Sequence, residues 1–320
     1  MAWGSFLMRN RIAVILALTV GIATAIVPGF ASLTTLSLAV DRGAAMGIVA
    51  VGLTVLLIAG KIDLSVGSVF AVSGIVAIQL QPALGLWPAA IVGVLAGMLC
   101  GAINGFVTVQ LKVNALVATL ATMLMFRAVA HWLTDSQPLA GGHIMFSIEL
   151  SRIYLDLFTA RSALFLLLVL ALHVWLSRTV GGRNLYAVGS NSEAAEASGL
   201  PVDRIVFLGF IFAGGMAGLA GVLQALATNT GSPVFGAEMT VAVIAAVVVG
   251  GTRIEGGRGS ALGTLGGVLT IAALTTAMEF QSVPAYFQRI VAGLILILIV
   301  VLDRNVAAPP RGSPQAHPAE

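Results

Sequence analysis

The chain has 320 residues, of which 58% are hydrophobic and 9% are charged, and its mean hydropathy is +1.04. A soluble domain carries about 25% charged residues, so this chain has too few to cover a water-facing surface. The net charge of +3 is small and the basic residues are scattered, which argues against nucleic-acid binding. The single cysteine, Cys100, excludes a disulfide framework and a cysteine metal site. The composition predicts an all-α polytopic membrane protein.

Long, continuous apolar runs predict helices, because the strands of a membrane barrel alternate over about ten residues. A membrane helix needs roughly 20 mostly apolar residues. The first run follows Arg9 and Arg11 and ends near Ala23–Ala25, as in a secretory signal, but the spans that follow it favour an uncleaved anchor. On this basis we predict about ten spans, at 12–30, 43–60, 66–81, 86–109, 115–134, 162–177, 204–228, 239–252, 260–279 and 285–302.

The loops on the N-terminal side of the membrane hold most of the 16 Lys and Arg residues, namely Arg9, Arg11, Lys61, Lys112, Arg178, Arg183, Arg204, Arg253, Arg258, Arg304 and Arg311. The remainder, which lie outside or within the membrane, are Arg42, Arg127, Arg152, Arg161 and Arg289. Because cytoplasmic loops are enriched in Lys and Arg, both termini are expected in the cytoplasm. We expect one transmembrane domain over 1–303, with a cytoplasmic loop at 178–203 and a disordered tail at 304–320.

The chain contains two similar segments that form a weak internal repeat. An apolar run passes into Gly60–Ser68 and a new helix, and a later run passes into Gly250–Ser260 and another helix. Two explanations remain open at this stage, chance and a duplication with glycine-interrupted helices of the kind that transporters use.

The loop 178–203 is the most informative segment. Ser190 and Glu193 have the spacing of a capping box, in which each side chain satisfies a free backbone amide. Gly199 can adopt the left-handed conformation that ends a helix, and Pro201 prevents its continuation. These signals predict a helix of about eight residues, roughly 12 Å long.

Two roles are open for this short helix. It can be a capped connector at the membrane surface. Alternatively, it can dock into a partner, because Ala194, Ala195 and Ala197 give it a small-residue surface that fits deep in a groove.

Polar residues within the apolar runs are candidates for a solute path. Lys61 and Asp63 lie beside a break rich in Gly and Ser, where they either snorkel to the surface or mark a broken helix whose backbone lines the path. The other polar residues either bond between helices or line the path, and Arg127 shares a helical face with His131. The candidate path residues are Asp63, Ser65, Asn104, Asn114, Thr119, Arg127 and Gln224. So few fixed charges suit a neutral, hydroxyl-rich solute.

Catalytic and metal-binding motifs are missing from the sequence. No pair of histidines has metal-ligand spacing, and there is no Gly-x-Ser-x-Gly nucleophile elbow. The only lysines, Lys61 and Lys112, precede Ile and Val, which excludes a Gly-Lys-Ser/Thr phosphate loop. We therefore expect a non-enzymatic chain without a metal or cofactor of its own. If ATP drives it, another subunit hydrolyses the ATP.

Several segments resemble the ribose-type permeases of bacterial ABC sugar importers, within the branched-chain amino acid/ribose superfamily. The resemblance runs from about residue 40 to Arg304. Lys61 departs from it, because the family usually has Gly at this position. The matching segments are Gly60–Ser68, Gly101–Gly105, Gly182–Asn191 with Ala194 and Ser198–Gly199, Ile244–Thr252 and Gly256–Gly259.

The resemblance implies a multi-pass inner-membrane permease that imports a sugar-like solute. It implies a cytoplasmic ATPase that binds ATP and Mg, a periplasmic sugar-binding protein, and a second permease copy or sister permease as partners. It also implies that the loop helix is the coupling helix that enters the ATPase, which assigns this role to Ser190, Ser192, Glu193, Ala194, Ala195, Ser198 and Gly199.

Two other classes of function are compatible with parts of the sequence. A gradient-driven secondary transporter or channel would need a relay of ionisable residues within the membrane. Arg127 and His131 are the only residues from which such a relay could begin. A membrane scaffold without transport would explain the packing but not the capped helix. A pentose, a hexose, a furanose signalling molecule and a polyol all suit the polar, uncharged path.

Overall fold

The computed structural model describes residues 11–155, 157–288, 290, 291, 293 and 294. Nearly all of its regular structure is helical, with one short antiparallel pairing between β1 and β2. In chain order the elements are α2 (Arg11–Ile26), α3 (Leu33–Ile58), α4 (Val66–Gln79), α5 (Gln81–Leu84), α6 (Leu86–Val109), α7 (Ala115–Leu133), β1 (Leu139–Ala140), α8 (Ile144–Leu150), α9 (Ala160–Arg178), α10 (Val180–Ser190), α11 (Ser192–Ala197), α12 (Val202–Ala227), β2 (Thr230–Gly231), α13 (Met239–Val249) and α14 (Ala261–Phe280).

Six of the described helices, α3, α6, α7, α9, α12 and α14, are long and apolar enough to cross a membrane. Three shorter apolar helices, Ile12–Ile26, Val66–Gln79 and Met239–Val249, coincide with three other predicted spans. The prediction of an all-α polytopic membrane protein is therefore confirmed. The predicted span 285–302 lies largely outside the described residues, and so does the tail 304–320.

The second span begins ten residues before the predicted start at 43, because α3 begins at Leu33. The side-chain oxygen of Ser32 accepts a hydrogen bond from the amide of Thr35 and so caps the helix. The predicted span began only after two charged residues, Asp41 and Arg42. Each of them has an ionic partner on another helix, Arg161 and Glu279 respectively, so the helix continues through both charges.

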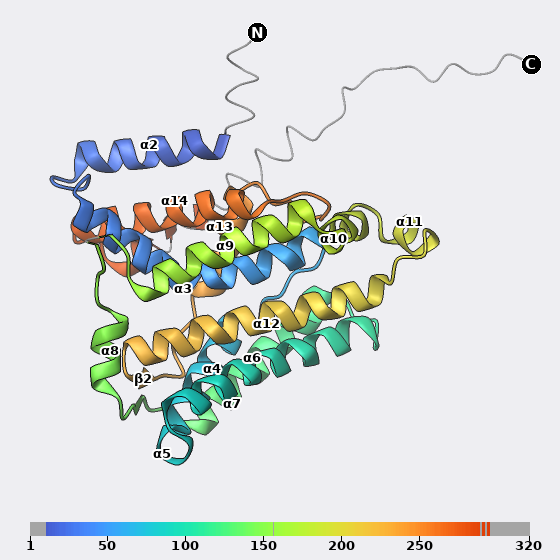
Figure 1. The fold of residues 1–320 in the computed structure, drawn as a ribbon, viewed down its shortest axis with the longest axis horizontal. Helices are drawn as coiled ribbons and strands as arrows, with labels where there is room; N and C mark the ends of the chain where they lie inside the picture. Colours follow the sequence, from blue (N-terminus) through green and yellow to red (C-terminus); the bar gives the residue numbers. More distant parts are fainter. Residues whose placement is uncertain (1–10, 156, 289, 292, 295–320) are drawn as a thin grey trace, which may run out of the picture.

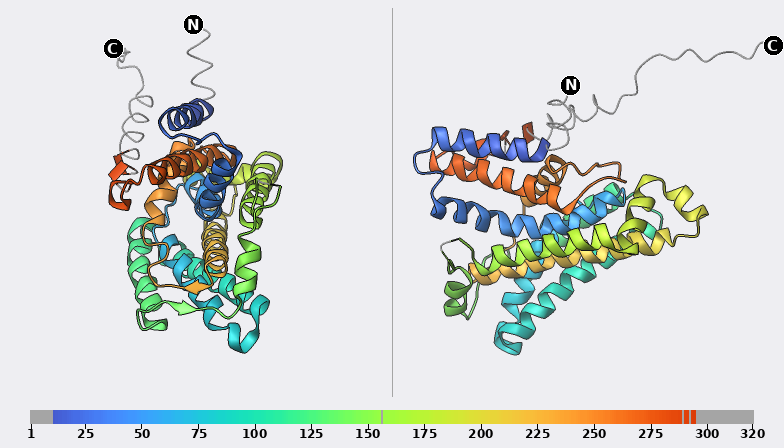
Figure 2. Two further views of the ribbon diagram at one scale, coloured as in Figure 1. Left: turned by 90° about the vertical axis from the view of Figure 1, so that its left-hand side faces the viewer. Right: turned by 45° about the horizontal axis from the view of Figure 1, so that its top comes forward.

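The helices form a bundle with α12 near its centre (Figures 1 and 2). α12 packs against α6, α4 and α3, while α14 packs against α3, α2 and α13. Most of the long helices run lengthwise between two ends, with α11 projecting at one end and α8 and β2 at the other (Figure 1). We call these the α11 end and the α8 end.

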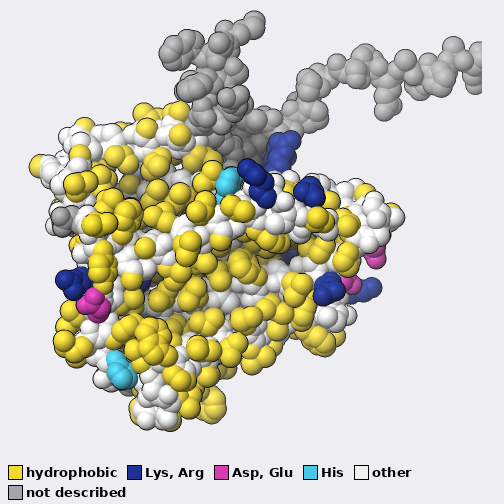
Figure 3. Space-filling view, viewed as in Figure 1, with side chains coloured by type: hydrophobic (Ala, Val, Ile, Leu, Met, Phe, Trp, Pro, Cys, Tyr) yellow, Lys and Arg dark blue, Asp and Glu magenta, His cyan; other side chains and the backbone are white. Residues whose placement is uncertain are grey.

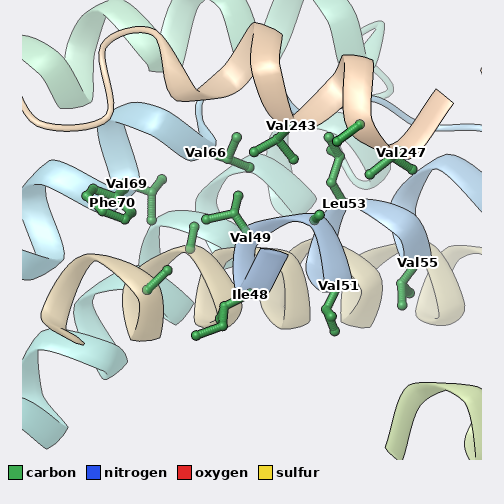
Figure 4. Close-up of a cluster of buried hydrophobic side chains, with 14 of the residues drawn as sticks. Ile48, Val49, Val51, Leu53, Val55, Val66, Val69, Phe70, Val243 and Val247 are labelled. Carbon is green, nitrogen blue, oxygen red and sulfur yellow. The ribbon is translucent and has the colours of Figure 1, made fainter. Parts of the chain in front are cut away.

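The core lies around α3, which is apolar on most of its circumference and is buried over most of its length. Val49 and Leu53 of α3 lie among Val69 of α4 and Val243 and Val247 of α13 (Figure 4).

Glycines let α6 and α12 approach closely, as small residues do in membrane bundles. A methyl group on Gly101 would lie 2.2 Å from the carbonyl oxygen of Phe210, and one on Gly214 would lie 2.4 Å from that of Gly97. The face shown in Figure 3 is densely apolar, as expected of a surface in contact with lipid.

Candidate functional site

The loop at the α11 end folds into two short helices with separate caps. The hydroxyl of Thr179 accepts from the amide of Gly182 at the start of α10, and the side chain of Asn191 accepts from the amide of Ala194 at the start of α11. The predicted capping role of Ser190 is therefore wrong. Ser190 is the last residue of α10, and its hydroxyl donates to the carbonyl of Tyr186. Since Asn and Ser cap equally well, the sequence did not determine which of the two adjacent residues would do so.

The end of α11 is built as the sequence predicts. Gly199 has a φ of +82°, which only glycine adopts at little cost. The amide of Gly199 donates to the carbonyl of Glu196, and the amide of Leu200 donates to that of Ala195. These two bonds form a Schellman motif, which satisfies carbonyls at the end of a helix. The loop helix thus has a fixed start and stop, but at six residues it is shorter than predicted.

The alanine surface of α11 is divided. Ala195 is buried against the bundle in a cluster that includes Leu200 and Val206, whereas Ala194 is exposed. Of the predicted coupling residues, the other exposed ones are Ser190, Ser192, Glu193, Ser198 and Gly199. Ala195 therefore anchors α11 to its own chain, and the remaining residues form an outward surface. We call this outward surface the α11 surface.

Backbone contacts connect this loop to two breaks between helices. The amide of Gly257, between α13 and α14, donates to the carbonyl of Ile58 at the end of α3. Gly189 of α10 lies so close to that carbonyl that an added methyl group would be 1.7 Å from its oxygen. A methyl group on Gly256 would lie 2.8 Å from the Cα of Gly60. We call this meeting point of Ile58–Gly60, Gly189 and Gly256–Gly257 the glycine junction.

A tyrosine adds a side-chain bond beside the glycine junction. The hydroxyl of Tyr186 donates a 2.8 Å hydrogen bond to the carbonyl of Gly259. A tyrosine is protonated at neutral pH at its ordinary pKa. Partial burial raises the pKa of Tyr186 further, so its hydroxyl is available as a donor. The sequence showed these glycine-rich segments as separate matches but gave no sign that they meet.

Asp63 lies at the break between α3 and α4, and its side chain is 0% exposed. One carboxylate oxygen accepts from both the amide and the hydroxyl of Ser65, each at 2.7 Å. The other accepts from the side-chain amide of Asn104 on α6 at 3.2 Å, and that amide also donates to the Ser65 hydroxyl at 2.7 Å. The carboxylate thus receives three hydrogen bonds.

Two threonines of α7 extend this cluster. Thr122 donates to the side-chain oxygen of Asn104 at 2.6 Å, and the hydroxyl of Thr119 accepts from the amide of Leu64. Across the break, Thr240 of α13 accepts from the amide of Gly67. The three hydroxyls and the Asn104 side chain connect the break to α6, α7 and α13. Asp63, Ser65, Asn104 and Thr119, all predicted path residues, therefore lie together.

The other predicted path residues lie elsewhere. Asn114 is an exposed cap of α7, where its side chain accepts from the amide of Leu116. Arg127 donates to the carbonyls of Pro233 and Phe235, in the segment that leads from β2 into α13. Gln224 of α12 accepts from Arg161 at 3.3 Å.

Arg161 and Asp41 form an ion pair toward the α8 end that the sequence did not predict. The two side chains are 14% and 15% exposed, and their nitrogen and oxygen atoms are 2.5 Å apart. Thr159 also donates to Asp41. A charge pair separated by this much sequence leaves no local pattern.

A cavity of about 900 Å³ lies at the α11 end between α11, α12 and the loops after α3 and α6. Lys61 and Lys112 line it together with Glu193, Glu196 and Asp203. Lys61 therefore lies at the mouth of the break and not with the buried Asp63. Within the described residues no group of His, Cys, Asp and Glu side chains has the geometry to hold a metal ion.

Comparison with known proteins identifies the family. The model of the branched-chain amino acid transport system permease component matches residues 34–300. The chain belongs to this family. No solved structure matches it.

Curated relatives are similar over nearly the whole chain. The chain is 32% identical to the ribose import permease protein RbsC of Haemophilus influenzae over 94% of both chains. It is 33% identical to the L-arabinose transport system permease protein AraH of Escherichia coli K12, over 87% of this chain and 85% of the relative. It is 35% identical to the L-arabinose ABC transporter permease protein AraH of Azospirillum brasilense, over 81% and 76%.

This permease is a multi-pass inner-membrane subunit of an ABC importer, and it is similar to the ribose and L-arabinose permeases named above. Like other members of its family it is a non-catalytic transport subunit, and the ATPase of such importers is a separate chain. The gradient-driven alternative is not favoured by these relatives.

Proposed function

We propose that this permease imports a neutral sugar, with a pentose as the first candidate, and that ATP hydrolysis in a cytoplasmic partner drives it through α11. A pentose is the first candidate because the similar permeases are named for ribose and L-arabinose, which are both pentoses. A periplasmic sugar-binding protein delivers the sugar at the α8 end. A second copy or a sister permease completes the membrane unit.

The proposed topology has ten membrane spans with both termini in the cytoplasm. It is supported by nine described apolar helices that coincide with predicted spans, and by the excess of Lys and Arg in the loops at one side. The α11 end then lies in the cytoplasm and the α8 end faces the periplasm.

The observation that carries the coupling role is the α11 surface itself. Hydrogen bonds fix both ends of α11, and Ala195 anchors it to the bundle. A helix held in this way transmits a displacement to α10 and α12 without bending. The two cytoplasmic breaks are reached directly through the glycine junction.

We place the sugar path beside the cluster of Ser65, Asn104 and Thr119. Its hydroxyl and amide groups can exchange hydrogen bonds with sugar hydroxyls, and they carry no net charge. The cluster is buried in this conformation, so the sugar reaches it when the bundle opens. Asp63 orients these groups, since it accepts from two of them. Arg127 and Gln224 are left out because neither belongs to this cluster. Arg127 bonds to the segment between β2 and α13, and Gln224 bonds to Arg161.

The experiment is a capture assay in the native host with tagged permease. Glu193→Trp places a bulky ring on the α11 surface, and Gly199→Leu imposes a left-handed backbone on a side chain that resists it. Both variants should insert into the membrane normally, but each should capture only a small fraction of the ATPase that co-purifies with the parent chain. Ile148→Trp, an exposed position on α8, is the matched control and should capture the ATPase normally.

Full ATPase capture by both α11 variants would remove the coupling role of α11. A parent chain that transports in purified form with no ATPase would remove the ATP-driven assignment itself. Competition of uptake by ribose, L-arabinose, glucose and a polyol then tests the sugar class.

A further inference from the structure

An apolar groove of about 640 Å³ lies between α9 and α12, with α3 beneath it and α10 at its end. Val55 of α3, Leu168 of α9, and Leu208 and Phe212 of α12 are among the side chains that line it. Figure 1 shows α9 and α12 on the near face with α3 between and behind them. We call this feature the α9–α12 groove.

The α9–α12 groove is about one leaflet deep. Along α12 its lining extends from Arg204, near the start of the helix, to Phe212, and Pro201 lines it just before the helix begins. Eight residues of helix rise about 12 Å, and half of a hydrocarbon core is about 15 Å thick. The groove is therefore long enough to contact only about two turns of a membrane helix from another chain. An acyl chain of one leaflet matches its length.

The polar end of the groove suits an anion. Arg204 is the one charged side chain among the described residues that line it, and Asn184 and Trp175 lie with it. Asp203, the neighbour of Arg204, lines the separate cavity at the α11 end. None of the described residues that line the groove with Arg204 carries a carboxylate. Lys and Arg side chains gather at this end of the molecule, whereas the middle of the same face is apolar (Figure 3).

We propose that the α9–α12 groove binds an anionic phospholipid. One acyl chain lies against Leu168 and Leu208, and the phosphate accepts hydrogen bonds from Arg204 and the side-chain amide of Asn184. Basic pockets between membrane helices bind anionic headgroups in this manner. The indole of Trp175 lies at the headgroup level, where tryptophan is enriched. The proposed topology is used only to name the leaflet, which is the inner one.

The test uses Trp175 as a reporter in the full-length chain, with Trp3, Trp87 and Trp132 replaced by Phe. The protein is reconstituted in phosphatidylcholine vesicles that contain increasing fractions of brominated phosphatidylglycerol or brominated phosphatidylcholine. Bromine quenches tryptophan fluorescence on contact. We expect brominated phosphatidylglycerol to reach half-maximal quenching at a mole fraction about fivefold lower, the preference that one surface arginine provides.

Arg204→Gln should abolish this preference while leaving quenching by brominated phosphatidylcholine intact, which shows that the variant is folded and inserted. Arg258→Gln is the matched control, because Arg258 is exposed at the same end outside the groove, and it should keep the preference. Equal quenching by both lipids in the parent overturns the proposal. An unchanged preference in Arg204→Gln also overturns it. Absence of quenching by either lipid means that protein covers the groove, which overturns it too.

Discussion

The backbone amide of Gly257 donates a 2.9 Å hydrogen bond to the carbonyl of Ile58, the last residue of α3. This bond joins the break after α3 to the break after α13, and Gly189 of α10 packs against the same carbonyl. The loop that carries α11 and both helix breaks thus meet through main-chain atoms. A rigid contact of this kind has little room to adjust when a side chain is added.

The first prediction concerns Gly189. Its replacement by Ala puts a methyl group 1.7 Å from the Ile58 oxygen and 2.8 Å from the Gly257 nitrogen, so α10 must shift. We expect a loss of about 1–3 kcal/mol in stability, as for other overpacked sites, and a lower Tm in detergent. Gly21→Ala is the control, because nothing lies within 4 Å of the added methyl group. An unchanged Tm for Gly189→Ala would contradict the close contact.

The second prediction concerns the pairing of Asp63 with Asn104. Asp63→Ala leaves the Ser65 and Asn104 donors without their acceptor, at a cost of about 1–3 kcal/mol for each buried group. Asp63→Asn turns an amide donor toward the Asn104 amide and should also lower the Tm.

The exchanged pair Asp63→Asn with Asn104→Asp restores a donor opposite an acceptor and still lets Thr122 donate to residue 104. Its Tm should lie above the value that the two single changes give when added together. Simple additivity in this double-mutant cycle would show that the two side chains do not interact.

The third prediction contrasts two adjacent charges on α3. Asp41→Asn removes the partner of Arg161, whose side chain is 14% exposed, and should cost about 2–4 kcal/mol, somewhat less than for a fully buried pair. Glu279→Gln removes the partner of Arg42 in a pair whose side chains are 42% and 43% exposed, and should cost about 0–1 kcal/mol. Thermal unfolding in detergent compares them directly. Similar losses would mean that burial does not distinguish the two pairs.

The fourth prediction tests which residue caps α11. Asn191→Ala removes the acceptor of the Ala194 amide and should destabilise α11 by about 1 kcal/mol. Hydrogen exchange of the amides in 193–197 should become faster. Ser190→Ala removes only a bond within α10 and should leave these amides unchanged. Faster exchange in the Ser190 variant alone would restore the capping box inferred from the sequence.

The sequence by itself located the helices to within a few residues in most cases. Val66, Leu86, Ala115 and Met239 start helices where the apolar runs predicted. Gly199 and Pro201 predicted the end of the loop helix because a positive φ and a missing amide are local properties. Residues 33–42 were missed, since the partners of Asp41 and Arg42 lie far along the chain.

Only the tertiary structure decided which polar residues work together. Asp63 lies in a helix break and Asn104 lies 41 residues further on in α6, and Thr122 of α7 adds a hydrogen bond to Asn104. The glycine junction unites segments near 60, 189 and 257, each of which the sequence shows only as a local break. Whether an apolar run spans the membrane depends on its own composition, so the sequence determines it directly. Which spans touch depends on the simultaneous packing of all of them, and no single segment of sequence carries that information.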